Sequence, residues 1–157
     1  MATYHLRTEI DIHASAEQVW SILLDFSSYP QWNPFIRSVS GVAEEGARLQ
    51  IAVQPNGGKV MRFSPIVLAA EAGRELRWRG RFVFPGIFDG EHCFVIEPLG
   101  EGKVRFEQSE QFSGLLVGLL RSSLERDTKR GFEDMNRALK ARAESVEEPV
   151  RDQVPAH

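Results

Sequence analysis

Apolar and polar residues alternate along residues 3–13, the pattern of a strand with one buried face. Tyr4, Leu6, Ile10 and Ile12 share one side, whereas His, Arg, Glu and Asp residues occupy the other. Because the side chains of a strand point alternately to the two faces of a sheet, this spacing predicts a half-buried strand.

The segment after this strand carries the signals of a helix start. Ser15 stands three residues before Gln18, the spacing of a capping box, and Val19 and Trp20 then begin an apolar side. Residues 25–35 contain two prolines and four aromatic residues, which predicts that the helix ends and a second short helix follows.

Short apolar runs separated by turn residues fill the middle of the chain. Such runs, bounded by Gly, Pro and Asn, are typical of antiparallel strands joined by short connections. We expect these strands at 36–42, 47–53, 59–70 with a break at Pro65, 74–82, 88–97 and 103–112. With residues 3–13 they predict an antiparallel sheet of about seven strands.

The last three strands allow a register to be worked out, since a slip of one residue would expose the apolar face. Turns at 85–86 and 100–102 place Trp78 opposite His92, and His92 opposite either Gln108 or Glu110. These side chains then share the apolar face. The opposite face carries mostly arginine and glutamate, which indicates a solvated lattice of charges.

From Gly114 the apolar spacing becomes that of a helix. Leucine, phenylalanine and methionine recur every three or four residues up to Leu139, and the helix is expected to end near Glu144. A helix of about 30 residues is about 45 Å long, enough to cross the concave face of such a sheet. Residues 145–157 have no such periodicity, and we predict a disordered tail after a single domain over 1–144.

Composition narrows the classes of function. A formal charge of -3 gives no general electrostatic field that would attract nucleic acid. Cys93 is the single cysteine, which excludes an intramolecular disulfide. No spacing of His and Cys is typical of a metal site, so we expect neither metal nor cofactor. The charged first residues and the lack of a long apolar segment favour a cytoplasmic protein without stable membrane insertion.

The order of strand, two short helices, antiparallel strands and one long helix resembles the START-like (SRPBCC) helix-grip superfamily, and within it the polyketide cyclase/dehydrase-type subgroup. The resemblance spans about residues 3–144. It is carried by residues 12–20 (IHASAEQVW), 25–26 (DF), 29–35 (YPQWNPF), 90–94 (GEHCF), 106–114 (FEQSEQFSG) and 132–140 (FEDMNRALK). It implies an α+β fold in which a curved antiparallel sheet wraps around the long C-terminal helix, with a hydrophobic cavity between them.

Two titratable residues on the apolar face are candidates for chemistry. His92 could act as a general base or bind a ligand carbonyl. Burial of Glu110 would favour the neutral, protonated form of its carboxyl group, which could then act as a proton shuttle at neutral pH. The alternatives are a core histidine with satisfied hydrogen bonds and a salt-bridged or solvated Glu110. Both interpretations stay open for both residues.

The predicted cavity wall combines aromatic, polar and helix residues. Aromatic side chains at strand spacing are also common in a plain core, so only some of them can face a ligand. The leucine-rich start of the long helix is apolar around more of its circumference than a core stripe requires, which fits a cavity lid, an oligomer contact or a transient membrane contact. Gly114 and Gly118 weaken this turn, which makes it a candidate for the cavity opening. The candidate ligand-binding residues are Trp32, Phe63, Trp78, Phe82, His92, Phe94, Gln108, Glu110, Phe112, Leu116 and Leu120.

Three functions follow from the resemblance and the candidate residues. The first is binding or transport of a lipid, polyketide, isoprenoid or similar apolar molecule by a monomer or homodimer. The second is a cyclase, dehydratase or isomerase that uses His92 and Glu110 in the same cavity. The third is a co-chaperone-like module that binds proteins and whose cavity is filled.

Overall fold

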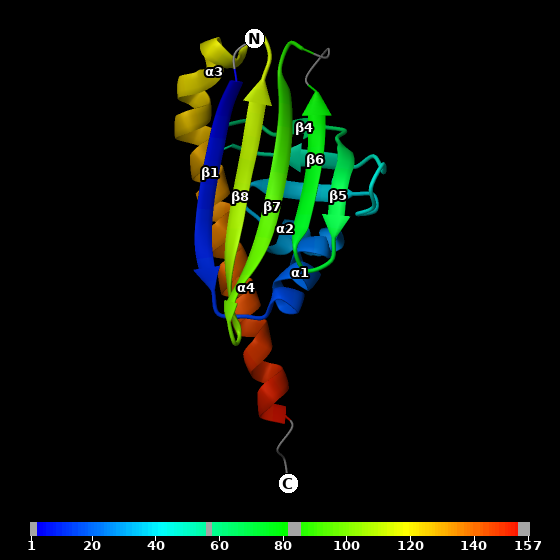
Figure 1. Cartoon of the computed structure of the whole chain (residues 1–157), viewed down its shortest axis with the longest axis vertical. Coiled ribbons are helices and arrows are strands. Elements are labelled where there is room, and N and C mark those ends of the chain that lie inside the picture. Colours follow the sequence, from blue (N-terminus) through cyan, green and yellow to red (C-terminus); the bar gives the residue numbers. More distant parts are fainter. Residues whose placement is uncertain (1–2, 56–57, 82–85, 154–157) are drawn as a thin grey trace.

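The computed structural model describes residues 3–55, 58–81 and 86–153, and of residues 146–153 the backbone alone. A five-stranded antiparallel sheet forms one wall of the molecule (Figure 1). Its strands, in spatial order, are β1 (Thr3–Ile12), β8 (Lys103–Ser113), β7 (Asp89–Gly100), β6 (Glu75–Arg81) and β5 (Ile66–Glu71). The predicted strand at residues 3–13 is therefore confirmed, and it pairs with the last strand of the chain.

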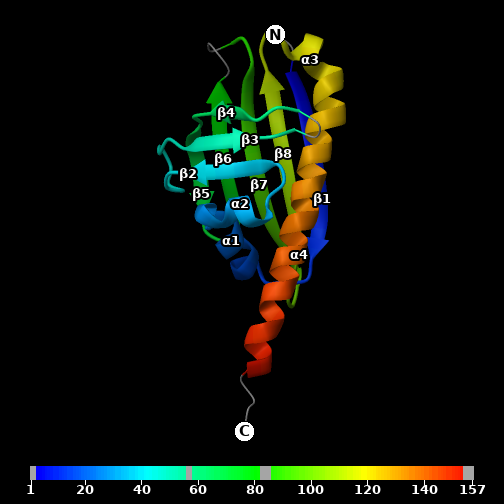
Figure 2. The same ribbon diagram turned by 180° about the vertical axis from the view of Figure 1, so that it is seen from behind.

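A smaller sheet lies over the inner side of the first (Figure 2). It contains β2 (Ile36–Ser40), β3 (Gln50–Val53) and β4 (Met61–Phe63), and a single bridge between Arg48 and Ile66 links it to β5. The described residues thus form eight strands rather than seven. The run at 59–70 is broken at Pro65, as expected, because proline lacks the N–H that a ladder requires. The chain passes there from one sheet to the other, so the run forms two strands.

Two short helices follow β1, as predicted. The first, α1 (Ala16–Leu24), begins at Ser15, whose hydroxyl accepts the backbone N–H of Gln18 at 3.1 Å. After a 3₁₀ turn, η1 (Phe26–Ser28), the second helix α2 covers Tyr29–Trp32. Pro30 stands at the start of α2, where a missing N–H costs no helical hydrogen bond.

The long terminal helix has three consecutive parts. They are α3 (Val117–Ser123), a π-helical stretch η2 (Leu124–Thr128) and α4 (Lys129–Gln153). The last part, α4, extends past the end expected near Glu144. Extending an existing helix costs far less than nucleating one, which is why the end of the apolar periodicity did not mark the end of the helix. The single domain over 1–144 and the disordered tail over 145–157 stay predictions.

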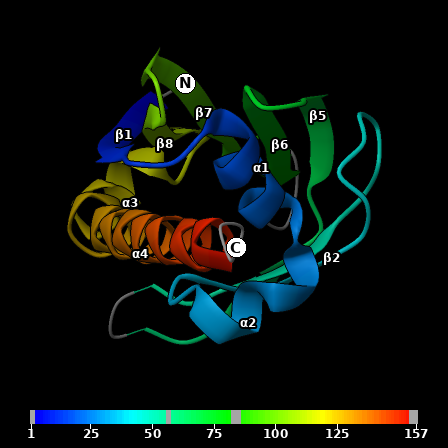
Figure 3. The ribbon, with the colours of Figure 1, turned by 90° about the horizontal axis from the view of Figure 1, so that it is seen from below.

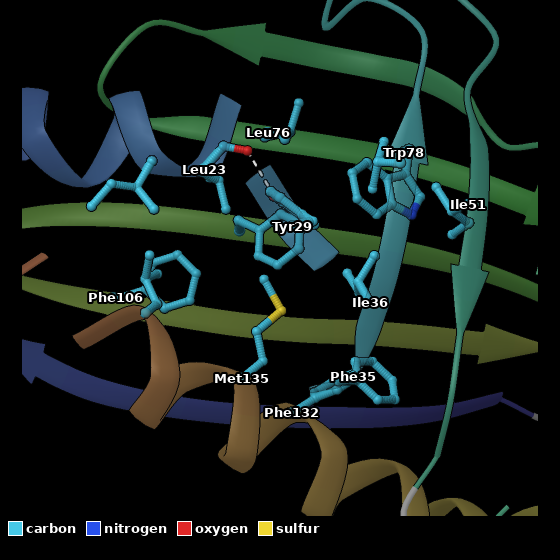
Figure 4. Close-up of a cluster of buried hydrophobic side chains, with 14 of the residues drawn as sticks. Leu23, Tyr29, Phe35, Ile36, Ile51, Leu76, Trp78, Phe106, Phe132 and Met135 are labelled. Carbon is cyan, nitrogen blue, oxygen red and sulfur yellow. Dashed lines mark hydrogen bonds between the residues drawn. The ribbon is translucent and has the colours of Figure 1, made fainter. Parts of the chain in front are cut away.

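The hydrophobic core lies where α4 meets the sheets. Figure 3 shows α4 enclosed between the five-stranded sheet and the segment of α2 and β2. Phe132 and Met135 of α4 are fully buried and lie beside Phe106 of β8 and Phe35, before β2 (Figure 4). The rings of Phe35 and Phe132 make an edge contact at 5.5 Å. Burial of each such side chain contributes about 1.5–3 kcal/mol, so this face of α4 holds the two sheets together.

The predicted register of the last three strands is confirmed. Trp78 of β6 lies opposite His92 of β7, and His92 lies opposite Glu110 of β8. Gln108 lies opposite Phe94, two residues away on the same face.

Candidate functional site

A cavity of about 110 Å³ lies between the two sheets and the π-helical stretch η2. Its wall is mostly apolar, and Trp78 lies there beside Ile36 and Ile51 (Figure 4). The five-stranded sheet and the small sheet supply most of the wall, and η2 supplies Leu124 and Thr128. An apolar wall with a few polar groups is the usual character of a small-molecule site.

His92 and Glu110 are the titratable groups in this wall. Nδ1 of His92 lies 3.1 Å from Oε1 of Glu110, because the two residues are cross-strand partners. The side chain of His92 is 6% exposed, whereas that of Glu110 is 18% exposed. Both residues of the pair line the cavity, and the carboxyl group is the more exposed of the two.

The imidazole of His92 is held on both faces as well as at both nitrogens. Its ring stacks on Trp78 at 5.5 Å and meets the edge of Phe132 at 5.0 Å. Nε2 lies 3.0 Å from Oε1 of Gln108, which is fully buried. The ring thus has a fixed orientation toward Glu110, the arrangement required of a proton-transfer group.

The polar contacts continue from Gln108 to the helix and the first strand. Nε2 of Gln108 donates to Oδ1 of Asn136 at 2.8 Å and lies 3.4 Å from the carbonyl of Phe132. Nδ2 of Asn136 donates to Oγ1 of Thr8 at 2.9 Å, and Thr8 donates to the carbonyl of Gln108 at 3.0 Å. This buried chain of contacts joins β7, β8, α4 and β1 behind the cavity.

Five of the predicted ligand-binding residues line the cavity: Phe63, Trp78, His92, Glu110 and Phe112. Their role in binding stays a prediction, as does the role of His92 and Glu110 in catalysis.

Five other predicted residues do not line it. Phe94 and Gln108 are fully buried behind the wall, and Trp32 packs against Tyr29 with ring centroids 5.2 Å apart. Leu116 and Leu120 lie near the start of the long helix, one to two turns before the η2 residues that reach the cavity. Phe82 lies outside the described residues.

Sequence reasoning missed several groups of the site, although some of them carried a signal. Thr8 falls on the same face of the first strand as Leu6 and Ile10, which marks it as an inward-facing polar residue. Asn136 stands four residues after Phe132, on the apolar side of the helix. Gly80 and Gly90 form a cross-strand pair in the cavity wall, and glycine within a strand often marks a place where another group approaches closely.

The outer face of the five-stranded sheet carries ion pairs. Arg77 bridges Glu75 at 3.1 Å and Glu91 at 3.2 Å, which confirms the predicted lattice of charges. Cys93 also lies on this face, beside Glu75 and away from His92. Burial, together with the charge of Glu75, raises the pKa of the Cys93 thiol to about 12.

The part of the chain that the structure describes contains neither a metal-binding cluster nor a membrane-spanning helix. No three His, Cys, Asp or Glu side chains there are grouped so that they could hold a metal ion. None of the helices formed by those residues is long and apolar enough to span a membrane.

Solved structures with this fold include several proteins with distant sequences. The aromatase/cyclase Zhui from Streptomyces sp. R1128 superposes with a TM-score of 0.75 at 18% identity, over 91% of this chain and 94% of that one. A START superfamily protein from Mycobacterium smegmatis gives a TM-score of 0.71 at 24% identity, over 90% and 98%. Norcoclaurine synthase from Thalictrum flavum gives 0.73 at 12% identity, over 94% and 98%. These similarities establish the START-like helix-grip fold.

No curated protein sequence matches the chain significantly. The profile of the family described as "Polyketide cyclase / dehydrase and lipid transport", however, matches residues 3–144. The match covers nearly all of the chain, from the first residue of β1 into α4, and includes every residue named above as lining the cavity. The chain therefore belongs to the polyketide cyclase/dehydrase and lipid transport family.

Proposed function

We propose that this protein binds a hydrophobic small molecule, of the lipid, polyketide or isoprenoid class, in the cavity between its sheets and η2. The observation that carries this proposal is the composition of the wall. Apolar side chains such as Ile51, Phe63 and Trp78 surround one hydrogen-bonded pair, His92 and Glu110. Burial of apolar ligand surface would supply the affinity, and the polar pair would orient the ligand.

The size of the cavity limits what can bind without movement. At about 110 Å³ it is smaller than the 300–1,000 Å³ that is usual for larger ligands, and apolar cavities of about 150 Å³ accommodate benzene. A single-ring ligand is therefore close to the limit of the observed cavity. A larger ligand requires the wall to move, and η2 is a suitable element because π-helical stretches pack less regularly than α-helices.

Native mass spectrometry of the protein purified from its own host tests this proposal, because a bound apolar molecule would copurify. Gly80→Val gives a variant with a filled cavity, since a Cβ on Gly80 meets only Pro65, at 3.8 Å. We expect this variant to lose the copurifying molecule. Gly118→Ala in α3, which lies outside the cavity wall, should keep it. A protein that copurifies with nothing and binds no apolar probe contradicts the proposal.

A second candidate function is acid–base catalysis on the same ligand. The observation that favours it is the 3.1 Å contact between His92 and Glu110 within the cavity wall, because a paired acid and base can move a proton to and from a substrate. Cyclase, dehydratase and isomerase reactions all need such a transfer. With the copurifying molecule as substrate, His92→Ala should abolish turnover while the dissociation constant changes little. Loss of affinity without any turnover in the natural protein favours carriage instead.

The co-chaperone-like alternative requires a filled interior and an apolar patch elsewhere. Leu115 and Leu119, at the start of the long helix, are exposed apolar side chains, but the interior retains the cavity. Ligand binding in the cavity is therefore the better supported function. A cytoplasmic location and a monomeric or homodimeric state stay predictions.

A further inference from the structure

The donors and acceptors in the buried chain of polar contacts can be assigned in one way only. The chain begins at a backbone carbonyl, which can only accept a hydrogen bond. The carbonyl of Gln108 lies 3.0 Å from Oγ1 of Thr8, so the hydroxyl hydrogen of Thr8 is used there. Oγ1 must then accept from Asn136, whose amide nitrogen Nδ2 lies 2.9 Å away. The amide oxygen of Asn136 is thereby turned toward Gln108.

The same reasoning fixes the next two groups. Oδ1 of Asn136 accepts from Nε2 of Gln108 at 2.8 Å, and the second hydrogen of that amide points toward the carbonyl of Phe132. Reversing the amides would leave both backbone carbonyls without these donors. Oε1 of Gln108 therefore faces Nε2 of His92 at 3.0 Å, and because an amide oxygen can only accept, Nε2 carries a hydrogen.

A hydrogen on Nε2 leaves two balanced arrangements at the other nitrogen of His92. In the first, the imidazole is neutral, and the carboxyl of Glu110 donates its hydrogen from Oε1 to Nδ1. In the second, the imidazole is charged, and Nδ1 donates to the carboxylate. The other two combinations are unfavourable. A charged imidazole beside a neutral carboxyl would leave a buried charge unpaired among aromatic rings. A carboxylate facing an unprotonated Nδ1 would place two hydrogen-bond acceptors against each other.

In both arrangements the shared hydrogen lies between Nδ1 and Oε1, so Oε2 of Glu110 carries none. Oε2 can therefore only accept. Glu110 lines the cavity, and within the described part of the chain no donor is bonded to Oε2. Thr128 is a further polar residue of the wall. Its hydroxyl can donate or accept a hydrogen bond, so it does not distinguish a ligand that carries a donor from one that carries an acceptor.

We propose that Glu110 makes this cavity selective for apolar molecules that carry a hydroxyl or N–H donor, with Gln108 and Asn136 as positioning residues that fix the hydrogen on Nε2 of His92. This inference rests on the proposed function and specifies its ligand. A ligand with a donor pairs with Oε2. A ligand without one removes water from Oε2 and leaves an unpaired acceptor, which lowers affinity roughly ten-fold.

The position of the hydrogen can be tested without any ligand. Nitrogen-15 NMR of the His92 ring should show a protonated Nε2 throughout the pH range in which the protein is folded. In Gln108→Leu the acceptor is absent, so Nε2 need not keep its hydrogen, and an unprotonated Nε2 is expected over part of that pH range. An unprotonated Nε2 in the natural protein overturns the inference, whatever the protein binds.

Selectivity can be tested by calorimetry with single-ring probes of nearly equal size. We compare p-cresol, which carries a donor, with 4-fluorotoluene, which carries none, and with 4-methylbenzaldehyde, which only accepts. The affinity ratio of p-cresol to 4-fluorotoluene should fall roughly ten-fold in Glu110→Met, because that variant lacks the acceptor. In the natural protein, 4-methylbenzaldehyde should gain nothing over 4-fluorotoluene.

Two variants serve as controls. Glu110→Gln should keep the ratio, because its amide can donate to Nδ1 and still present an oxygen to the cavity; it also keeps the test valid if Glu110→Met does not fold. Thr128→Val should keep the ratio as well. Equal ratios in the natural protein and Glu110→Met overturn the selectivity while the proposed function stands. Binding of none of the probes overturns the selectivity, and together with the absence of a copurifying molecule it overturns the proposed function as well.

Discussion

The carboxyl group of Glu110 lies directly against the backbone of Gly90, and a Cβ on Gly90 would overlap its Oε2 atom. Gly90→Ala should therefore displace the carboxyl and disturb its contact with His92. We expect a loss of about 1–3 kcal/mol in the free energy of unfolding, measured by urea denaturation, because overpacking of a filled site costs this much.

The cross-strand neighbour Gly80 provides the matched control. A Cβ there makes only an ordinary contact with Pro65, so Gly80→Ala should be neutral or slightly stabilising. In a Glu110→Ala background, Gly90→Ala should cost much less than it does alone, because the overlapping atom is gone. An equal cost in both backgrounds would show that the overlap is not the cause.

A second pair of glycines lies in the long helix. Replacing a helical glycine by alanine usually stabilises a protein by up to about 1 kcal/mol. Gly118 has open space at its Cβ position, so Gly118→Ala should follow this rule. A Cβ on Gly131 would overlap the ring of Phe35, so Gly131→Ala should instead destabilise by about 1–3 kcal/mol. Thermal unfolding of the two variants should shift in opposite directions, and a shift in the same direction contradicts the packing described for Phe35.

Cys93 should react slowly with alkylating reagents. Its pKa of about 12, raised mainly by burial and further by Glu75, leaves the thiol protonated at pH 8. Because only the thiolate reacts, we expect iodoacetamide to modify the folded protein at least ~100-fold more slowly than the urea-unfolded chain. Mass spectrometry reads this directly, since the chain has a single cysteine.

The Glu75→Gln variant isolates the electrostatic part of this effect. Removing the negative charge lowers the pKa of Cys93 and should speed the reaction, although burial keeps it slower than in the unfolded chain. An unchanged rate would mean that access to the thiol, and not its ionisation, limits the reaction.

Glu144 should make the stability of the fold dependent on pH. Its hydrogen bond with Lys140, at 2.7 Å, and the backbone N–H of His13, at 2.8 Å, hold its pKa below the ordinary value of 4.5. The folded state therefore binds this proton more weakly than the unfolded state does. The resulting stability is fully present above pH 4.5 and is lost as the pH falls through the lower, folded pKa.

Glu144→Gln should accordingly have a lower melting temperature than the natural protein at pH 7. The difference should shrink as the pH falls below 4.5. Glu133→Gln, a replacement in the same helix at a residue for which no ion pair is described, is the control and should show no such trend. A difference for Glu144→Gln that is the same at pH 7 and pH 3 would contradict the linkage.

Local patterns were sufficient for much of the fold. The alternation of side chains along the strands placed Trp78, His92 and Glu110 on one face. The turn positions placed His92 opposite Trp78 and opposite either Gln108 or Glu110, of which the structure selects Glu110. Pro65 shows where such reasoning stopped. The break that it makes in the run at 59–70 was predicted, but the passage of the chain to another sheet at that point was not. A proline marks a break in a ladder, but it does not say which strand the chain joins next.

The candidate site was predicted in part for a similar reason. The acid–base pair follows from strand register, which is a local property of two neighbouring strands. The contribution of the helix does not: Leu124 and Thr128 reach the cavity, whereas Leu116 and Leu120 do not. Which turn of a helix meets the cavity depends on how far the helix slides along the sheet, and every leucine of its stripe carries the same apolar signal.

The sequence by itself determined the faces of the strands and the long amphipathic helix, and it narrowed the partner of His92 to Gln108 or Glu110, because side-chain periodicity and short turns act over a few residues. The structure selects Glu110. Only the tertiary structure decided that Thr8, Gln108 and Asn136 form one directed set of hydrogen bonds. Thr8 and Asn136 are separated by 128 residues along the chain and meet only because α4 packs across β1 and β8. That packing, and not any local pattern, fixes the hydrogen on Nε2 of His92 and makes Oε2 of Glu110 an acceptor.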